Sequence, residues 1–334
     1  MIKMKNPKLM SFIKENTAMS AVLFMLILGT ILYGGKFMNY NRNLINVLHY
    51  ASMLGVMGVG VNLCFLIGAR DLSVSAVAAA SSMFAAVASP YGVVASIAAG
   101  LTCGLIFGLF NGIIVAKFKV QPFIATLGTQ LAARGVALLV NNERSVEIDT
   151  ATPYLKNIGN YNIGGILPIP AAIFIGLILI MVFVTRCTPF GRSVYAVGGN
   201  EEAAEMMGIR VSKIKLMVFV ISGLTAALTG IILAGHISAG QPTACEGWEM
   251  TIMAAIVIGG TSVRGGLGKI SGIFPGVIFV QFITNLINLH GRISAYWKDI
   301  LTGVILLIAV LLQVYSDSQK EKKKHIRNLE EQSV

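Results

Sequence analysis

Residues 93–116 read VVASIAAGLTCGLIFGLFNGIIVA, a run of 24 residues without a single charged side chain. This length suits one helical crossing of a bilayer, which needs about 20 predominantly apolar residues. Comparable blocks recur along the 334-residue chain, in which 55% of the residues are hydrophobic and only 12% are charged. Because about a quarter of the residues in a soluble domain are charged, the pattern argues against a water-soluble enzyme and predicts a polytopic membrane protein.

The apolar blocks predict an all-α membrane protein with ten transmembrane helices. The third block is rich in Ala and Ser, and small residues let helices approach closely, so it is expected inside the bundle. The eighth block is short for a crossing, and a re-entrant hairpin is the alternative there. The ten predicted segments are 18–34, 51–68, 72–89, 93–116, 123–140, 168–185, 214–235, 250–262, 270–288 and 296–315.

The net charge of +11 is distributed in a way that predicts orientation. If the N-terminus is cytoplasmic, nineteen Lys and Arg residues fall on the cytoplasmic side and five on the outer side, which satisfies the positive-inside rule. The basic residues lie in short loops rather than on one face, so orientation explains the charge better than nucleic acid as a partner. Both termini are then cytoplasmic, with residues 1–316 as the transmembrane domain and 317–334 as a charged tail.

Helices two to five and helices seven to ten have opposite topology in this arrangement. The weakly hydrophobic third segment and the short eighth segment occupy the same place in the two groups. This is the pattern of an inverted repeat whose broken helices line a substrate path. The sequence therefore predicts a transporter, and the repeat rests on topology because no identity between the two groups is visible.

The chain contains no motif for an energy source of its own. The nearest approach to a phosphate-binding loop, 265-GGLGKI-270, lacks the leading Gly and ends in Ile rather than Ser or Thr. Asp299 is the only acidic residue within the predicted spans, which disfavours an ion-coupled carrier. No catalytic or metal-ligand spacing is visible in the sequence, which disfavours an integral-membrane enzyme. We expect no cofactor or metal in this chain, and a separate ATPase that holds ATP and Mg²⁺.

The longest cytoplasmic connection, 186–215, is the expected contact with that ATPase. Its centre, 198-GGNEEAAEMMGI-209, predicts a helix over Glu201 to Met207, with Asn200 as the N-cap and Gly208 at the end. Its apolar side favours docking into a groove of the ATPase, and a helix resting on the bilayer surface is an equal alternative. The proposed coupling residues are Gly198, Gly199, Asn200, Glu201, Ala203, Ala204 and Gly208.

Three stretches of the sequence have a recognisable pattern: 108-GLFNGIIVAKFKVQPFIATLGTQLAARGVALL-139, 190-FGRSVYAVGGNEEAAEMMGI-209 and 254-AAIVIGGTSVRGGLGKISG-272. They resemble the membrane permeases of ribose, xylose and galactoside ABC importers. The resemblance implies a multi-pass permease in the cytoplasmic membrane of a prokaryote that imports a monosaccharide. It also implies a second permease copy, a cytoplasmic ATPase and an external sugar-binding protein. The alternative is the same fold with branched amino acids, nucleosides or a sugar-like signal as its cargo.

The segment 68-GARDLSVSA-76 departs from the family pattern G-G-I-D-L-S-V-G-S at four positions. Asp71 and Ser73 are retained, and the resemblance implies that they belong to a cytoplasmic gate. Arg70 is expected either to form a local ion pair with Asp71, worth little if exposed, or to meet lipid headgroups.

Uncharged polar side chains in the spans are candidates for the sugar path, because amides and hydroxyls bind sugar hydroxyls without the cost of a buried charge. Two stripes at helical spacing stand out, on helices five and nine, and Asn288 extends the second. Hydrogen bonds between helices are the alternative role. Arg134 is expected to face a wet cavity near the outer opening or to extend toward the outer headgroups. The predicted path residues are Asn62, Asn111, Thr126, Thr129, Gln130, Arg134, Gln281 and Asn285.

Overall fold

The computed structural model describes residues 17–149, 153–291, 294, 296–308 and 310–311, and regular structure among them is almost entirely helical. The predicted tail 317–334 lies outside the described residues. The longer helices are α2 (Thr17–Tyr33), α4 (Ile45–Leu66), α6 (Val93–Ala116), α7 (Pro122–Leu139), α9 (Ile169–Cys187), α12 (Val211–Ile237) and α14 (Ile273–His290). The shorter helices are α3 (Gly35–Met38), α5 (Val74–Val87), α8 (Pro153–Asn160), α10 (Pro189–Gly199), α11 (Glu201–Met206) and α13 (Trp248–Ile258). Residues 297–308 are also helical.

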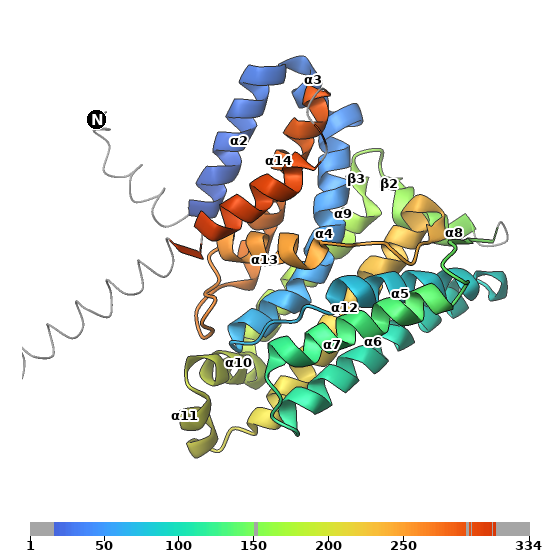
Figure 1. Ribbon diagram of the computed structural model, residues 1–334. Helices are drawn as coiled ribbons and strands as arrows, with labels where there is room; N and C mark the ends of the chain where they lie inside the picture. Colours follow the sequence, from blue (N-terminus) through green and yellow to red (C-terminus); the bar gives the residue numbers. More distant parts are fainter. Residues whose placement is uncertain (1–16, 150–152, 292–293, 295, 309, 312–334) are drawn as a thin grey trace, which may run out of the picture.

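The helices form two groups that α4 joins. Helices α5, α6, α7 and α12 lie side by side as an oblique bundle, and α2, α13 and α14 form the second group (Figure 1). Two short antiparallel strand pairs lie in the connections: β1 (Val146–Glu147) pairs with β4 (Ala239–Gly240), and β2 (Asn162–Ile163) pairs with β3 (Leu167–Pro168). Helices α10 and α11 lie at one end of the molecule, with α3 and α8 at the opposite end (Figure 1).

Six helices in the described part of the chain have the length and apolar composition of a membrane crossing. They are the helical stretches that include α4, α6, α7, α9, α12 and α14, and α2, α5 and α13 are shorter apolar helices. Large apolar side chains such as Leu131, Leu179 and Phe183 are exposed on their outer surfaces. An all-α polytopic membrane protein is therefore confirmed at this level.

Helix boundaries follow the apolar pattern where that pattern is uninterrupted. Helix α6 coincides with the predicted segment 93–116. The predicted start of the second segment at residue 51 is wrong, because α4 begins at Ile45 and continues through polar His49 and Tyr50. The eighth segment is also shorter than predicted, because α13 ends at Ile258 and the chain then turns through Gly260, at φ 89°.

The prediction that the third segment lies inside the bundle is confirmed, because α5 is buried along most of its length. The connection before α5, residues 67–73, is irregular. Residues 238–247, between α12 and α13, are also irregular apart from β4. The two short helices α5 and α13 are thus each preceded by a break in regular structure.

Helices α6 and α12 pack with their backbones in contact. A glycine recurs at every fourth residue of α6, at Gly100, Gly104, Gly108 and Gly112. A Cβ atom on Gly104 would lie only 2.4 Å from the backbone oxygen of Gly223 in α12. Small residues at this spacing let membrane helices approach closely, and here they bring α6 directly onto the central helix α12.

Candidate functional site

A buried polar network occupies the connection between α4 and α5. Asp71 is only 1% exposed, and its Oδ1 atom accepts hydrogen bonds from the backbone N–H and the hydroxyl of Ser73, at 3.0 and 2.6 Å. Its Oδ2 atom accepts one from the hydroxyl of Ser222 in α12, at 2.7 Å. Each carboxylate oxygen therefore has a hydroxyl donor, which offsets part of the cost of burying an acidic group.

The network continues into α6 and α7. The side-chain amide of Asn111 donates to the hydroxyl of Ser73 at 2.9 Å, and its oxygen accepts from Thr129 at 2.6 Å. The hydroxyl of Thr126 lies 2.8 Å from a backbone oxygen of its own helix and 3.3 Å from that of Arg70. Residues predicted for the gate and for the path thus meet in one network that links α6, α7 and α12 to the break before α5.

The expected ion pair between Arg70 and Asp71 is absent. Gly68, at φ 76°, bends the chain after α4, and Asp71 then points into the bundle while Arg70 is exposed. An ion pair does join Lys215 to Glu201, near the start of α12. The ion-pair alternative is wrong because it treated this segment as an exposed helix end, whereas the bend turns the carboxylate inward. The exposed Arg70 leaves contact with lipid headgroups as the other expectation.

A second polar cluster joins α7 to the segment before α13. The Nη1 atom of Arg134 donates to the backbone oxygens of Pro242 and Ala244, at 2.6 and 3.0 Å. One turn earlier on α7, Gln130 donates to Oε1 of Glu249 at 3.1 Å. The two α7 side chains therefore hold residues 242–249 against α7.

Sequence reasoning missed Glu249, which is 9% exposed. The eighth helix was predicted to start at residue 250, whereas α13 starts at Trp248 and contains this acid in its first turn. An acidic residue suits that position because the helix dipole is positive there, and this signal was present in the sequence. The Oε2 atom of Glu249 is buried without a hydrogen-bond partner in the described structure. With Asp71, it shows that the bundle does contain buried carboxyl groups.

The amides predicted to line the path divide into two kinds. Asn285 exchanges hydrogen bonds with Asn43 at 2.7 and 3.1 Å, which ties α14 to the turn before α4. Asn62 is buried in α4 and donates to the backbone oxygen of Lys269 at 3.3 Å. Both therefore make contacts between elements, which was the alternative role considered for them. Gln281 and Asn288 instead line a cavity.

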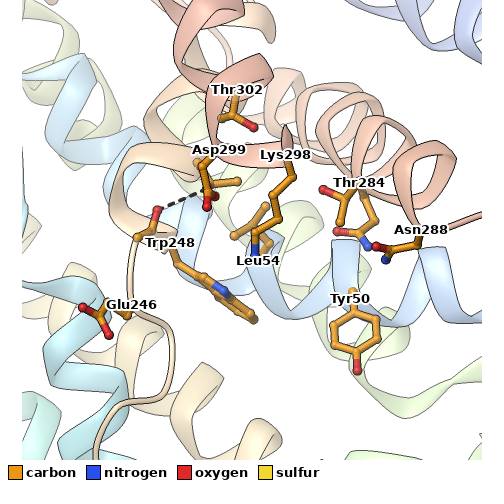
Figure 2. Close-up of a pocket in the computed structure, with 12 residues that line it drawn as sticks. Tyr50, Leu54, Glu246, Trp248, Thr284, Asn288, Lys298, Asp299 and Thr302 are labelled. Carbon is orange, nitrogen blue, oxygen red and sulfur yellow. Dashed lines mark hydrogen bonds between the residues drawn. The ribbon is translucent and has the colours of Figure 1, made fainter. Parts of the chain in front are cut away.

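This cavity lies between α4, α13, α14 and the helix 297–308, and its volume is about 310 Å³ (Figure 2). Trp248, Lys298 and Asp299 project from two of its walls, and Tyr50 lies below them (Figure 2). Ten of the twelve lining residues carry a polar side-chain group, which distinguishes the cavity from a lipid-facing groove. They are Tyr50, Glu246, Trp248, Thr251, Gln281, Thr284, Asn288, Lys298, Asp299 and Thr302.

The helix predicted in the connection 186–215 is confirmed as an element. Helix α11 runs from Glu201 to Met206, and the side chain of Asn200 accepts a hydrogen bond from the backbone N–H of Ala203 at 2.9 Å. The chain leaves the helix at Gly208, whose φ of 83° suits a glycine. The helix is one residue shorter than predicted, and its N-cap is the expected one.

The two sides of α11 have different surroundings. Ala204 is fully buried, and Glu201 forms an ion pair with Lys215 of α12 at 2.6 Å. Met206 is 83% exposed and Met207 is 70% exposed. The helix is thus held to the protein on one side and presents two flexible apolar side chains on the other.

Helix α10, directly before α11, meets the end of α4 and the connection after α13 at what we call the glycine junction, formed by Gly198, Leu66 and Gly266. The backbone N–H of Gly266 donates to the backbone oxygen of Leu66 at 2.9 Å. A Cβ atom on Gly198 would lie 1.8 Å from that oxygen and 2.6 Å from the Gly266 nitrogen. Tyr195 donates to the backbone oxygen of Gly268 at 3.0 Å, and burial raises the pKa of its phenol.

Comparison with known proteins identifies a family and several relatives that match this chain. The model of the family "branched-chain amino acid transport system / permease component" matches residues 43–310. The ribose import permease of Escherichia coli K12 is 37% identical over 90% of this chain and 94% of its own length. The ribose import permease of Bacillus subtilis is 36% identical over 87% of this chain and 90% of its own length. The L-arabinose transport system permease of E. coli K12 is 36% identical over 80% of this chain and 81% of its own length.

No solved structure matches the chain. The family model covers most of the chain, and the alignments with the two ribose permeases cover at least 90% of each of those proteins. The apolar helices have the dimensions of membrane crossings. The chain therefore belongs to the family of ABC importer permeases that includes these ribose and arabinose proteins, and it is a multi-pass inner-membrane protein.

Proposed function

We propose that this chain is the membrane-spanning permease of an ATP-powered importer that carries a monosaccharide of the ribose, xylose or galactoside class. The observation that carries the proposal is the match to the E. coli ribose import permease, which extends over 94% of that protein. The arabinose permease is similar at nearly the same level. Pentoses are therefore the first cargo to test.

The proposed topology has ten crossings, with both termini in the cytoplasm. The six long helices are joined by the shorter α2, α5 and α13, and the helix 297–308 belongs to the tenth crossing. Among the described Lys and Arg residues in connections and at helix ends, ten lie at the α11 end and five at the opposite end. The excess of positive charge supports the α11 end as cytoplasmic.

An inverted repeat is part of this proposal. One group consists of α4, α5, α6 and α7, and the other of α12, α13, α14 and the helix 297–308. The irregular connections 67–73 and 238–247 interrupt the two groups at the same place and at opposite ends of the molecule. Broken helices at equivalent positions of two repeats are typical of transporters that bind their substrate between the repeats.

The proposed partners are a cytoplasmic ATPase, an external sugar-binding protein and a second permease copy. The exposed Met206 and Met207 favour docking of α11 into an apolar groove of the ATPase. The glycine junction supports transmission from α10 and α11 to the ends of α4 and α13. The ATPase holds ATP and Mg²⁺, and this chain is proposed to have no catalytic activity of its own.

Branched amino acids are the second candidate cargo, because the description of the matching family names them. The test is uptake of labelled D-ribose, L-arabinose and L-leucine by cells without other importers for these solutes. The cells express the chain together with a candidate ABC ATPase and a candidate sugar-binding protein from the same genome. Pentose uptake that requires all three proteins supports the proposal. Uptake of L-leucine without uptake of any sugar would overturn it.

A further inference from the structure

The polar cavity of Figure 2 lies toward the α3 end of the molecule, where a cargo would enter from outside in the proposed topology. Its wall contains Tyr50 from the first half of α4 and Asn288 near the end of α14. A cavity of about 310 Å³ falls at the lower end of the range for small-molecule sites, about 300–1,000 Å³. That size suits a ligand as small as a monosaccharide.

The lining distinguishes this cavity from a groove filled by lipid. Another cavity, of about 430 Å³, lies beside α6 and is lined almost entirely by apolar groups, among them Phe84, Ile106 and Val136. Lipid chains fit such a lining. The polar cavity instead offers amides, hydroxyls and carboxylates, which would lose hydrogen bonds to water if hydrocarbon filled it.

The available groups match the chemistry of a sugar. In the described structure, the side-chain amides of Gln281 and Asn288 and the indole N–H of Trp248 make no hydrogen bond to the protein. An amide both donates and accepts, as a sugar hydroxyl does. The indole ring of Trp248 adds an apolar face, which suits the C–H groups of a sugar ring, beside a polar N–H. Asp299 supplies an acceptor from the facing helix.

Hydrogen bonds from α7 hold the wall of the cavity that carries Trp248. Its neighbour Glu249 points away from the cavity and accepts from Gln130 of α7 at 3.1 Å. Arg134 holds the preceding backbone through Pro242 and Ala244. Gln130 and Arg134 are therefore positioning residues for Trp248, and they need not touch the cargo themselves.

We propose that this cavity binds the monosaccharide during transport, with the Trp248 ring against one face of the sugar and Gln281, Asn288 and Asp299 bonded to its hydroxyls. The proposal rests on the proposed function. It names the residues that contact the cargo inside the membrane, as distinct from those of the external binding protein.

The first test compares the two tryptophans of the chain in the complete importer. Trp297 does not line the cavity, so Trp297→Ala is the matched control for Trp248→Ala. We expect Trp248→Ala to lower the maximal rate of D-ribose uptake at least tenfold. The KM should change less than twofold, because the external protein sets the concentration dependence. Trp248→Phe should restore part of the rate, and Trp297→Ala should leave it unchanged.

The second test measures binding directly. In the full-length Trp297→Phe variant, Trp248 is the only tryptophan and reports on the cavity. D-ribose should change its emission in a saturable way in lipid nanodiscs, L-leucine should not, and Asn288→Ala should weaken the response. Asn288 is exposed, so this substitution leaves folding intact and remains informative if Trp248→Ala does not fold.

The outcomes separate the two proposals. If the unmodified importer takes up no monosaccharide, the proposed function fails. If it transports D-ribose but Trp248→Ala and Asn288→Ala keep at least half of the maximal rate, the cavity is not the site. An emission of Trp248 that D-ribose leaves unchanged in a transport-competent protein also overturns the cavity assignment.

Discussion

Gly198→Ala perturbs the glycine junction by adding a single carbon atom, the Cβ of the alanine. The added Cβ would lie 1.8 Å from the backbone oxygen of Leu66. Close carbon–oxygen contacts are normally about 3.3 Å or longer, so the two backbones must separate by about 1.5 Å. Neither neighbour is the end of a flexible side chain, so no rotamer change can relieve the clash.

The size of the effect follows from two contributions. Forcing an extra carbon atom into a packed contact costs about 1–3 kcal/mol. Separating the backbones also breaks the hydrogen bond from Gly266 to Leu66, which is worth about 0.5–1.5 kcal/mol net. We therefore expect Gly198→Ala to lower the free energy of unfolding by about 1.5–4.5 kcal/mol, or to displace α10 from the junction at a similar cost.

Gly199→Ala is the matched control. A Cβ atom on Gly199 meets nothing within 4 Å, and both glycines lie at the end of α10, where Ala is the better helix former. The difference between the two variants therefore isolates the clash. Thermal unfolding of the purified full-length chain measures stability, and ATP hydrolysis together with sugar uptake by the complete importer measures coupling.

The expected result is that Gly198→Ala uncouples the importer while Gly199→Ala behaves as the unmodified protein. The Gly198→Ala complex should still assemble and hydrolyse ATP, but its sugar uptake should fall at least tenfold. If the two alanine variants unfold at the same temperature and transport equally well, the junction does not transmit the movement and this reasoning is refuted.

Three further substitutions test other contacts. Gly104→Leu should lower the unfolding temperature because α6 touches the α12 backbone there. Gly128→Leu is the control and should not lower it, because a Cβ atom on Gly128 meets nothing within 4 Å. Equal unfolding temperatures for the two variants would contradict this packing. Arg134→Ala removes two hydrogen bonds from a charged donor and should lower the free energy of unfolding by about 2–4 kcal/mol, with Arg134→Lys intermediate. If both variants unfold and transport as the unmodified protein does, these contacts are dispensable. Met206→Glu with Met207→Glu should reduce co-purification of the ATPase without changing the unfolding temperature, and full retention of the ATPase would exclude α11 as the docking helix.

Local patterns predicted the elements well where the physics is local. An apolar run fixes a crossing, as in residues 93–116, and an N-cap followed by acidic residues fixed the start of α11 at Glu201. The small residues of α5 correctly indicated burial. These features depend on neighbours within one or two helical turns, which a sequence displays directly.

Contacts between distant residues were not predictable in the same way. Asn285 and Gln281 lie four residues apart on one helix face, yet the first pairs with Asn43 and the second lines the cavity. Helical spacing places side chains on a face, but the packing of other helices decides what that face meets. The inward turn of Asp71 likewise depends on the bend at Gly68 and on a hydroxyl from α12.

The backbone contact between α6 and α12 has a mechanical consequence. Side chains that interdigitate loosely can slide past one another, but at Gly104 and Gly108 the backbone of α6 lies directly against the backbone of α12 around Gly223, with little side-chain material between them to rearrange. We therefore expect α6 and α12 to move together as one rigid unit, with α6 on the outer side of the bundle (Figure 1). Opening and closing of the pathway is then expected to involve movement of other helices relative to this pair.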